Sequence, residues 1–131
     1  RDEYDNGERA MLNFGHTAGH AVEAAGGFRR FTHGEAVALG MLAAAQLSER
    51  QAGLAGGTTE KLRSVLEDYH LPVELSGVTT DMLLEFMRQD KKRSGGSINW
   101  VLLTQVGRAE SRRGISDESV RQALQVILRV E

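Results

Sequence analysis

The stretch AVALGMLAAAQLSERQ, residues 36–51, is rich in alanine, leucine and methionine, which favour helices. It follows Thr32 and Glu35, whose three-residue spacing has the form of a capping box at a helix start. Because the run is apolar around most of a helical circumference, it predicts a helix buried at the centre of the domain. The segments on either side are expected to pack around it.

The neighbouring segments predict further helices. Upstream, apolar residues recur at helical spacing over residues 8–25, and Gly26-Gly27 marks a stop. Downstream, the glycine-containing residues 53–57 break the central helix. A third, amphipathic helix is expected over residues 59–70, ending before Pro72.

A fourth helix is expected over residues 80–89, and the sequence leaves open whether Thr79 or Thr80 caps it. Its apolar residues share one side at helical spacing. The side chains expected to face inward are Met82, Leu83, Phe86 and Met87.

The last third of the chain predicts a hairpin and a final helix. Residues 98–104 are β-branched and aliphatic, and the turn Val106-Gly107 leads to a partner strand over residues 109–112. Ser116 is expected to cap the last helix. That helix should carry on one side Val120, Leu124, Ile127 and Leu128. The fold class predicted is therefore a mainly α, multi-helix domain with one small β hairpin.

Size and composition limit the function classes. A chain of 131 residues that is 40% hydrophobic fits one domain, here residues 1–131. It has no cysteine, so metal ligands are restricted to histidine, aspartate and glutamate. Its net charge is -2, and its charged residues are scattered along the chain without forming a basic face, which argues against nucleic acid as a partner. No segment resembles a membrane span or a secretory signal, so a cytoplasmic protein is expected, and the start at Arg1 suggests a piece of a longer chain.

Three of the four histidines lie within eighteen residues, at positions 16, 20 and 33. His16 and His20 are four residues apart, so they share one face of the predicted helix. Such a pair is compatible with a metal or substrate site and equally with a partly exposed polar face. His33, at the start of the next helix, joins them only if the connection over residues 26–31 brings that start back.

Polar residues form a stripe along the first predicted helix. Asparagine and histidine are poorer helix formers than the residues that usually cover a solvated face, which suggests a task for the stripe. Gly15 and Gly19 also lie inside this predicted helix, and their small size indicates close approach of a backbone or a ligand. The members of the stripe, at spacings of four, four, three and four, are Asp5, Arg9, Asn13, His16 and His20.

Two long motifs carry a family resemblance. RAMLNFGHTAGHAVE, residues 9–23, and HGEAVALGM, residues 33–41, resemble the signature of 3-dehydroquinate synthases. Further blocks follow the same pattern in the same order, namely Asp2-Glu3 with Gly7 and Arg9, and Asp90-Lys91-Lys92. The resemblance extends over essentially the whole chain and implies the helical, metal-binding C-terminal domain of that family.

The resemblance implies that His16 and His33 bind one zinc ion, or cobalt in its place. The third ligand would be a glutamate of a separate nucleotide-binding domain. His20 would contact the reacting part of the substrate without binding the metal. Spacing alone favours His16 and His20 as the chelating pair, so the assignment of His33 follows from the resemblance only.

Other residues would hold the substrate. By motif position, the resemblance places Arg9 and Asn13 at the substrate's anionic and hydroxyl groups, and a guanidinium suits an anion. One of Lys91 and Lys92 would add a positive charge, although cations are also favoured at an ordinary helix C-terminus. Asp5 stands where many family members carry glutamate. The expected substrate contact would have to be made by the shorter side chain of aspartate.

The implied activity belongs to the shikimate pathway of aromatic amino acid biosynthesis. The enzyme is a lyase that converts 3-deoxy-arabino-heptulosonate 7-phosphate to 3-dehydroquinate and phosphate, with bound NAD used and regenerated. No segment has the strand, glycine turn and helix order of a dinucleotide site, because Gly26-Gly27 and Gly56-Gly57 follow predicted helices, so NAD is expected on an N-terminal domain absent from this chain. The resemblance suggests a homodimer for the full-length form, with no membrane partner. The 131-residue chain alone is expected to fold, to bind zinc poorly and to be inactive.

Three alternatives stay open. Other sugar phosphate cyclases, of the deoxy-inosose or epi-valiolone synthase type, and metal-dependent glycerol or alcohol dehydrogenases have a similar helical domain. The constellation of Asn13, His16 and His20, with residues 90–92, favours a phosphorylated acid over the dehydrogenase substrates. A non-catalytic helical binding module is the third alternative.

Overall fold

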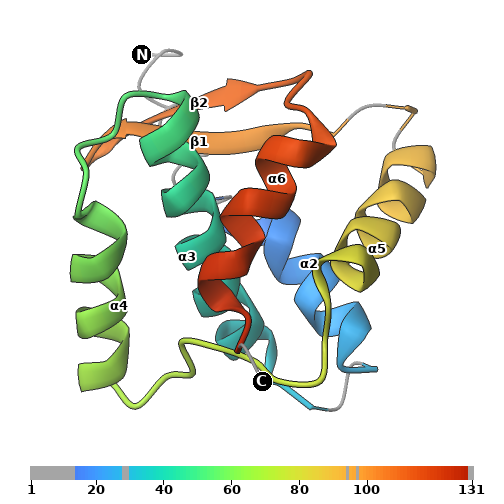
Figure 1. Cartoon of the computed structure of the whole chain (residues 1–131), viewed down its shortest axis with the longest axis horizontal. Coiled ribbons are helices and arrows are strands. Elements are labelled where there is room, and N and C mark those ends of the chain that lie inside the picture. Colours follow the sequence, from blue (N-terminus) through green and yellow to red (C-terminus); the bar gives the residue numbers. More distant parts are fainter. Residues whose placement is uncertain (1–13, 28–29, 94, 97, 130–131) are drawn as a thin grey trace.

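The computed structural model describes residues 14–27, 30–93, 95–96 and 98–129. Helix α3 (His33–Gln51) is central, and the elements packed against it include α2 (His16–Ala25), α4 (Thr58–Asp68) and α6 (Asp117–Leu124). Figure 1 shows α4 and α5 (Thr80–Arg93) at opposite sides of the molecule, and α5 packs against α2 and α6. No helix in these residues is long and apolar enough to cross a membrane.

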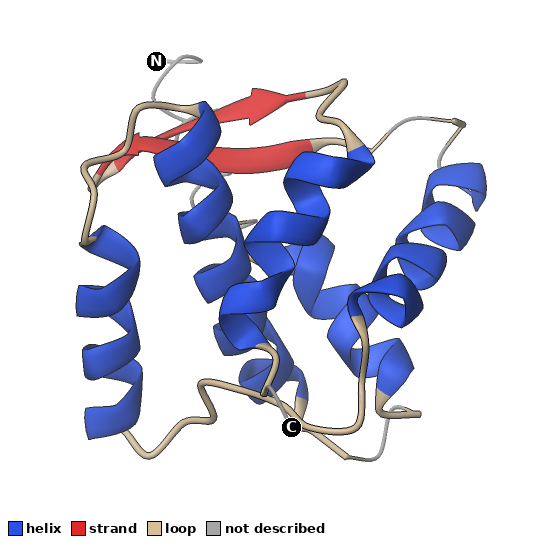
Figure 2. Cartoon of the chain, in the orientation of Figure 1, coloured by secondary structure: helices blue, strands red, loops and turns tan. Residues whose placement is uncertain are grey.

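An antiparallel hairpin completes the fold. Strand β1 (Trp100–Gln105) pairs with β2 (Arg108–Arg112), and a bulge interrupts the register between Leu103 and Gln105. Figure 2 shows the hairpin lying across one end of the helical layer. The predicted fold class, mainly helical with one small hairpin, is confirmed.

The central helix forms as its sequence predicts. The Thr32 hydroxyl accepts a hydrogen bond from the Glu35 amide at 3.1 Å, and Glu35 Oε1 accepts one from the Thr32 amide at 2.9 Å. These two bonds place His33 in the first turn. The buried side of α3 includes the fully buried residues Leu39, Leu42 and Leu47.

The first predicted helix differs from α2 at its start. Residues 8–13 lie outside the described residues, while Phe14 and Gly15 form a turn and the helix begins at His16. Gly15 has φ 88°, a left-handed conformation that cannot continue a right-handed helix and that glycine adopts at little cost. The predictions that the helix runs through residues 14–15 and that Gly15 lies inside it are therefore wrong.

Helices α2 and α3 cross at very short range. A Cβ added at Gly40 would lie 2.1 Å from the Gly15 carbonyl oxygen and 2.5 Å from the Gly19 nitrogen. A Cβ at Gly15 would lie 2.6 Å from Met41 Cγ and 2.8 Å from the Met41 nitrogen. Most of these neighbours are backbone atoms, which cannot rotate away. The predicted close approach at Gly15 and Gly19 is real, and its partner is the backbone of α3.

Polar contacts hold the other elements to α3. The Ser48 hydroxyl is fully buried, donates to the Ala44 carbonyl at 2.7 Å and accepts from the Leu103 amide at 2.9 Å, which links β1 to α3. The Glu49 carboxylate accepts from the Thr59 amide at 2.7 Å and from the Thr59 hydroxyl at 2.6 Å. It also accepts from the Gly57 amide at 3.3 Å, so a side chain of α3 caps the start of α4.

Helix α5 is longer than predicted, and one of the side chains expected to face inward is exposed. It continues to Arg93, so Lys91 and Lys92 lie in its last turn, where the helix dipole favours cations. Thr79 is the cap, since its hydroxyl accepts from the Met82 amide at 3.1 Å. The inward placement of Met82 is wrong, because its side chain is 40% exposed and the buried positions are Leu83, Leu84 and Met87.

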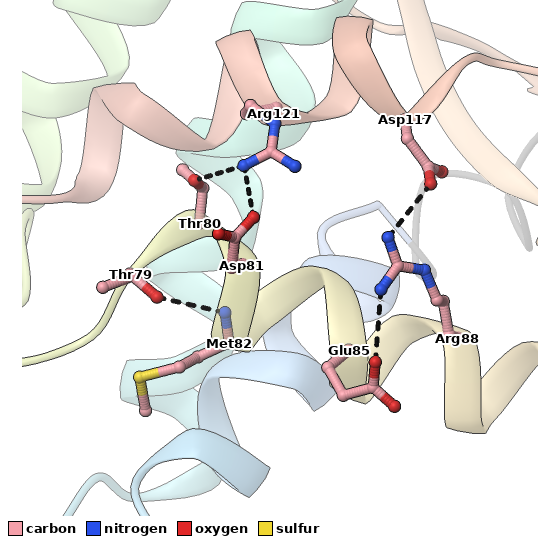
Figure 3. A network of polar contacts seen from close by, with 8 residues as sticks. All are labelled: Thr79, Thr80, Asp81, Met82, Glu85, Arg88, Asp117 and Arg121. Carbon is pink, nitrogen blue, oxygen red and sulfur yellow. Dashed lines mark hydrogen bonds and ion pairs between the residues drawn. The ribbon is translucent and has the colours of Figure 1, made fainter.

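Ion pairs join α5 to α6, as Figure 3 shows. Arg121 lies 2.5 Å from an Asp81 oxygen and donates to the Thr80 hydroxyl at 3.1 Å. Arg88 lies between Glu85, at 3.2 Å, and Asp117, at 3.4 Å. These contacts join the first turn and the middle of α5 to α6.

Two predicted helix ends shift. The helix that Ser116 caps ends at Leu124, and residues 125–127 form a 3₁₀ turn, η1 (Gln125–Ile127). Leu128, expected on the helix, instead forms a bridge with Leu75, because the chain turns there to pair with that segment. Helix α4 spans residues 58–68 where 59–70 were predicted, and it ends before Pro72 as expected.

We predict that Gly40→Ala destabilises the domain by about 1–3 kcal/mol, because the added methyl group meets backbone atoms of α2. The better helix propensity of alanine offsets at most about 1 kcal/mol of this cost. Urea unfolding followed by circular dichroism measures the change. Gly34→Ala, where a Cβ meets nothing within 4 Å, is the control and should leave stability unchanged or higher. Equal effects of the two substitutions would contradict the close crossing.

We also predict that Glu49 makes stability depend on pH. Partial burial raises the pKa of its carboxyl, but the hydrogen bonds from Thr59 and Gly57 outweigh this and bring the pKa below its ordinary 4.5. A lowered folded-state pKa stabilises the fold above the unfolded-state pKa, and this stability is lost as pH falls through the folded-state pKa. The wild type should exceed Glu49→Gln in unfolding free energy at about pH 7, with a much smaller difference at about pH 3.

Urea unfolding at the two pH values tests this expectation, with Glu67→Gln on the exposed side of α4 as the control. A difference between wild type and Glu49→Gln that stays constant with pH would contradict the role of the Glu49 carboxylate.

Candidate functional site

The three clustered histidines meet at one place. His16 and His20 lie in the first two turns of α2, and His33 begins α3. Their ring centroids are 5.8 Å apart for His16 and His33, 6.1 Å for His16 and His20, and 6.5 Å for His20 and His33. The connection between the helices therefore does return His33 to the first helix.

The spacing of His16 and His33 fits a shared metal ion. Histidine nitrogens lie about 2.0–2.1 Å from zinc, which puts the centroids of two ligating rings on the order of 5–6 Å apart. The rings meet edge to face, with an interplanar angle of 69°. Within the described ranges, however, no three His, Cys, Asp or Glu side chains are arranged to hold a metal. The short distances between the histidine ring centroids therefore do not show that three donor atoms point at one metal ion. The described residues supply only part of a ligand set.

The electrostatics favour a neutral imidazole at His16. Burial lowers the pKa of His16, and the charges of His20 and His33 lower it further, while Glu23 opposes them. Metal binding requires the neutral ring, whose unprotonated nitrogen is the ligand. The shift is in the direction that a metal ligand needs.

His33 has a carboxylate partner. Its Nδ1 lies 3.0 Å from Glu23 Oε1, across the junction of α2 and α3. Sequence reasoning did not single out Glu23. Its position seven residues after His16 and three after His20 places all three on one face of α2, and that spacing is the signal that was available.

Lys91 lines a pocket beside the histidine helix. The pocket has a volume of about 270 Å³, and among the described residues its walls are Thr17, Met87, Asp90, Lys91, Ile98, Asn99 and Arg113. Thr17 directly follows His16 and donates a hydrogen bond to the Asn99 carbonyl at 3.2 Å. Lys92, although described, is not part of the pocket wall. Arg113 is a second cation here, and sequence reasoning missed it.

Three of the residues that were assigned to substrate contacts lie outside the described residues. They are Asp5, Arg9 and Asn13. The structure brings together His16, His20 and His33, and it places Lys91 near the start of α2 through the shared pocket with Thr17.

The fold matches part of two solved synthase structures. A 2-epi-5-epi-valiolone synthase from Streptomyces hygroscopicus subsp. jinggangensis, solved with NAD+ and Zn2+ bound, matches with TM-score 0.77 and 24% identity, covering 89% of this chain and 32% of that one. A 2-deoxy-scyllo-inosose synthase, complexed with carbaglucose-6-phosphate, NAD+ and Co2+, matches with TM-score 0.76 and 22% identity. That second match covers 95% of this chain and 36% of the other. At these identities the matches show the fold alone.

The sequence relatives identify the family, which the structural matches do not. The 3-dehydroquinate synthase of Methylacidiphilum infernorum is 42% identical over 122 residues, 93% of this chain and 34% of the relative. That of Xylella fastidiosa is 45% identical over 130 residues, 95% of this chain and 33% of the relative. The family model described as 3-dehydroquinate synthase C-terminal matches residues 1–93. The chain belongs to the 3-dehydroquinate synthase C-terminal family, and it spans about a third of the length of these relatives.

Proposed function

We propose that residues 1–131 are the metal- and substrate-binding domain of a 3-dehydroquinate synthase. The enzyme would convert 3-deoxy-arabino-heptulosonate 7-phosphate to 3-dehydroquinate and phosphate, in the shikimate pathway. The observation that carries the proposal is the convergence of His16, His20 and His33 in a chain whose relatives bear that name at 42–45% identity.

His16 and His33 would hold a divalent metal through neutral ring nitrogens, with a third ligand from a nucleotide-binding domain outside residues 1–131. When bound, the metal would supply a Lewis acid that favours oxidation of a substrate alcohol by NAD. Two proteins of this fold were solved with NAD+ and with Zn2+ or Co2+, which supports a metal and NAD for the proposed enzyme. NAD would bind to the nucleotide-binding domain, and the full-length enzyme would be a cytoplasmic homodimer.

His20 would serve the substrate and not the metal. It is exposed on the same face of α2, one turn beyond His16. From there its ring would orient the substrate or relay a proton as phosphate leaves, because imidazole exchanges protons near neutral pH. Its ring centroid lies 6.1 Å from the ring centroid of His16, so a substrate bound at a metal on His16 would lie next to the His20 ring.

Cationic and polar side chains would fix the ends of the substrate. Arg9 and Asn13, with Asp5, would hold its carboxylate and hydroxyl groups, as the family pattern implies. We propose Lys91 as the lysine of this set, because it lines the pocket next to Thr17 and Lys92 does not. An anionic group in this pocket would face the positive charge of Lys91, beside the helix that carries His16 and His20.

Phosphate release by the full-length gene product tests the proposal. With 3-deoxy-arabino-heptulosonate 7-phosphate as substrate, His16→Ala and His33→Ala should each lower kcat/KM by at least about 100-fold and reduce metal content. His70→Asn is the control, since asparagine tolerates the left-handed backbone found there at φ 60°, and it should leave both quantities unchanged.

Two results would contradict the proposed function. One is a lack of phosphate release from this substrate by the wild-type gene product, and the other is full turnover in the two histidine variants. The same assay on the 131-residue chain alone should give no turnover, because residues 1–131 are proposed to lack the NAD site and the third metal ligand.

The lysine assignment has its own test. Lys91→Ala should lower kcat/KM by about 10- to 100-fold, the effect of losing a hydrogen bond to a charged group. Lys92→Ala, one position along the same exposed helix end, is the matched control and should stay within about 3-fold of wild type. Steady-state kinetics of both variants decides between them, and a larger effect at Lys92 would refute the assignment.

A further inference from the structure

We propose that Glu23 is a positioning residue that holds the His33 ring in the tautomer with Nε2 free for the metal. The inference rests on the proposed function, since it assumes that His16 and His33 share a metal ion. It adds a residue of this chain to which no role has been assigned.

The hydrogen bond defines the tautomer. An ionised carboxylate can only accept, so at 3.0 Å from Glu23 Oε1 the Nδ1 atom of His33 must be the donor. In a neutral imidazole the other nitrogen, Nε2, then carries the lone pair. Metal-binding histidines commonly donate their second ring N–H to a carboxylate in this way, which fixes the ring and makes it more basic.

The exposed fractions of the two side chains indicate that Glu23 holds His33 in place, and not the reverse. The Glu23 side chain is 16% exposed, whereas the His33 side chain is 60% exposed. Little apolar packing restrains the His33 ring, so the carboxylate is its main restraint. Without Glu23, the ring would be expected to sample other rotamers and the other tautomer.

The place of Glu23 on its helix needs a reason other than helix stability. Helix α2 ends at Ala25, so Glu23 lies in its last turn. The helix dipole disfavours a negative charge at that end. A contact with His33 at the start of α3 accounts for an acid at this position.

A purely structural ion pair is the competing explanation. In that case Glu23 would pair with protonated His33 and help to dock α3 on α2. Exposed ion pairs contribute little to stability, and such a role would leave zinc affinity unchanged. Metal affinity therefore separates the two explanations, independently of catalytic activity.

The experiment measures zinc dissociation constants of the demetallated full-length gene product, by competition with a chromogenic chelator. Glu23→Ala should raise Kd by about 10- to 100-fold. Glu23→Gln should give an intermediate value, because the amide oxygen still accepts from Nδ1 but the charge is lost. Glu67→Gln, an exposed acid on α4, is the matched control and should not change Kd. In a His33→Ala background, Glu23→Ala should add no further loss.

A second readout follows the ring itself. Nitrogen-15 chemical shifts of the metal-free protein should show His33 protonated at Nδ1 in the wild type, with a shift toward Nε2 protonation in Glu23→Ala. Circular dichroism confirms that each variant is folded, and the nearly isosteric Glu23→Gln carries the test if Glu23→Ala is not folded.

The outcomes distinguish the two proposals. If His16→Ala and His33→Ala weaken zinc binding and the Glu23 variants do not, the role of Glu23 is refuted and the metal site stands. If neither histidine variant weakens zinc binding, both the metal site and the role of Glu23 are refuted.

Discussion

The contact of Gly40 with Gly15 and Gly19 is the constraint on which the site depends. At this crossing the backbones of α2 and α3 approach so closely that a single methyl group would overlap a carbonyl oxygen. The left-handed turn at Gly15 starts α2 at His16, next to the crossing. The distance between the two helices, and with it the distance between His16 and His33, is therefore set by backbone contact and not by flexible side chains.

The rest of the fold keeps that crossing in place. The capping box at Thr32 and Glu35 fixes the first turn of α3, where His33 lies. Ser48 joins the hairpin to the same helix, and α5 packs on the far side of α2 and brings Lys91 toward Thr17. The central helix α3 thus forms both the core of the domain and one side of the site. A change in the packing around α3 would therefore change the positions of the histidines.

Local signals made part of this predictable from sequence. The capping box and the apolar run of residues 36–51 predicted α3, because both act within one helix. The prediction of a helix through Gly15 was wrong because helical spacing in the sequence does not reveal a left-handed residue. The lack of room for a side chain at Gly15 is set by Met41, which is distant in sequence. The close approach at Gly19 was predicted, but its partner Gly40 was not. The pairing of His16 with His33 rested on family resemblance, since spacing alone favoured His20.

X-ray absorption at the zinc edge would show whether His16 and His33 share a metal ion, because it counts the imidazoles bound to the metal in the full-length gene product. We expect two imidazole ligands with nitrogens at about 2.0–2.1 Å from zinc in the wild type, and one in either His16→Ala or His33→Ala. A zinc shell with no imidazole, or one that both substitutions leave unchanged, would contradict a site built on the crossing of these two helices.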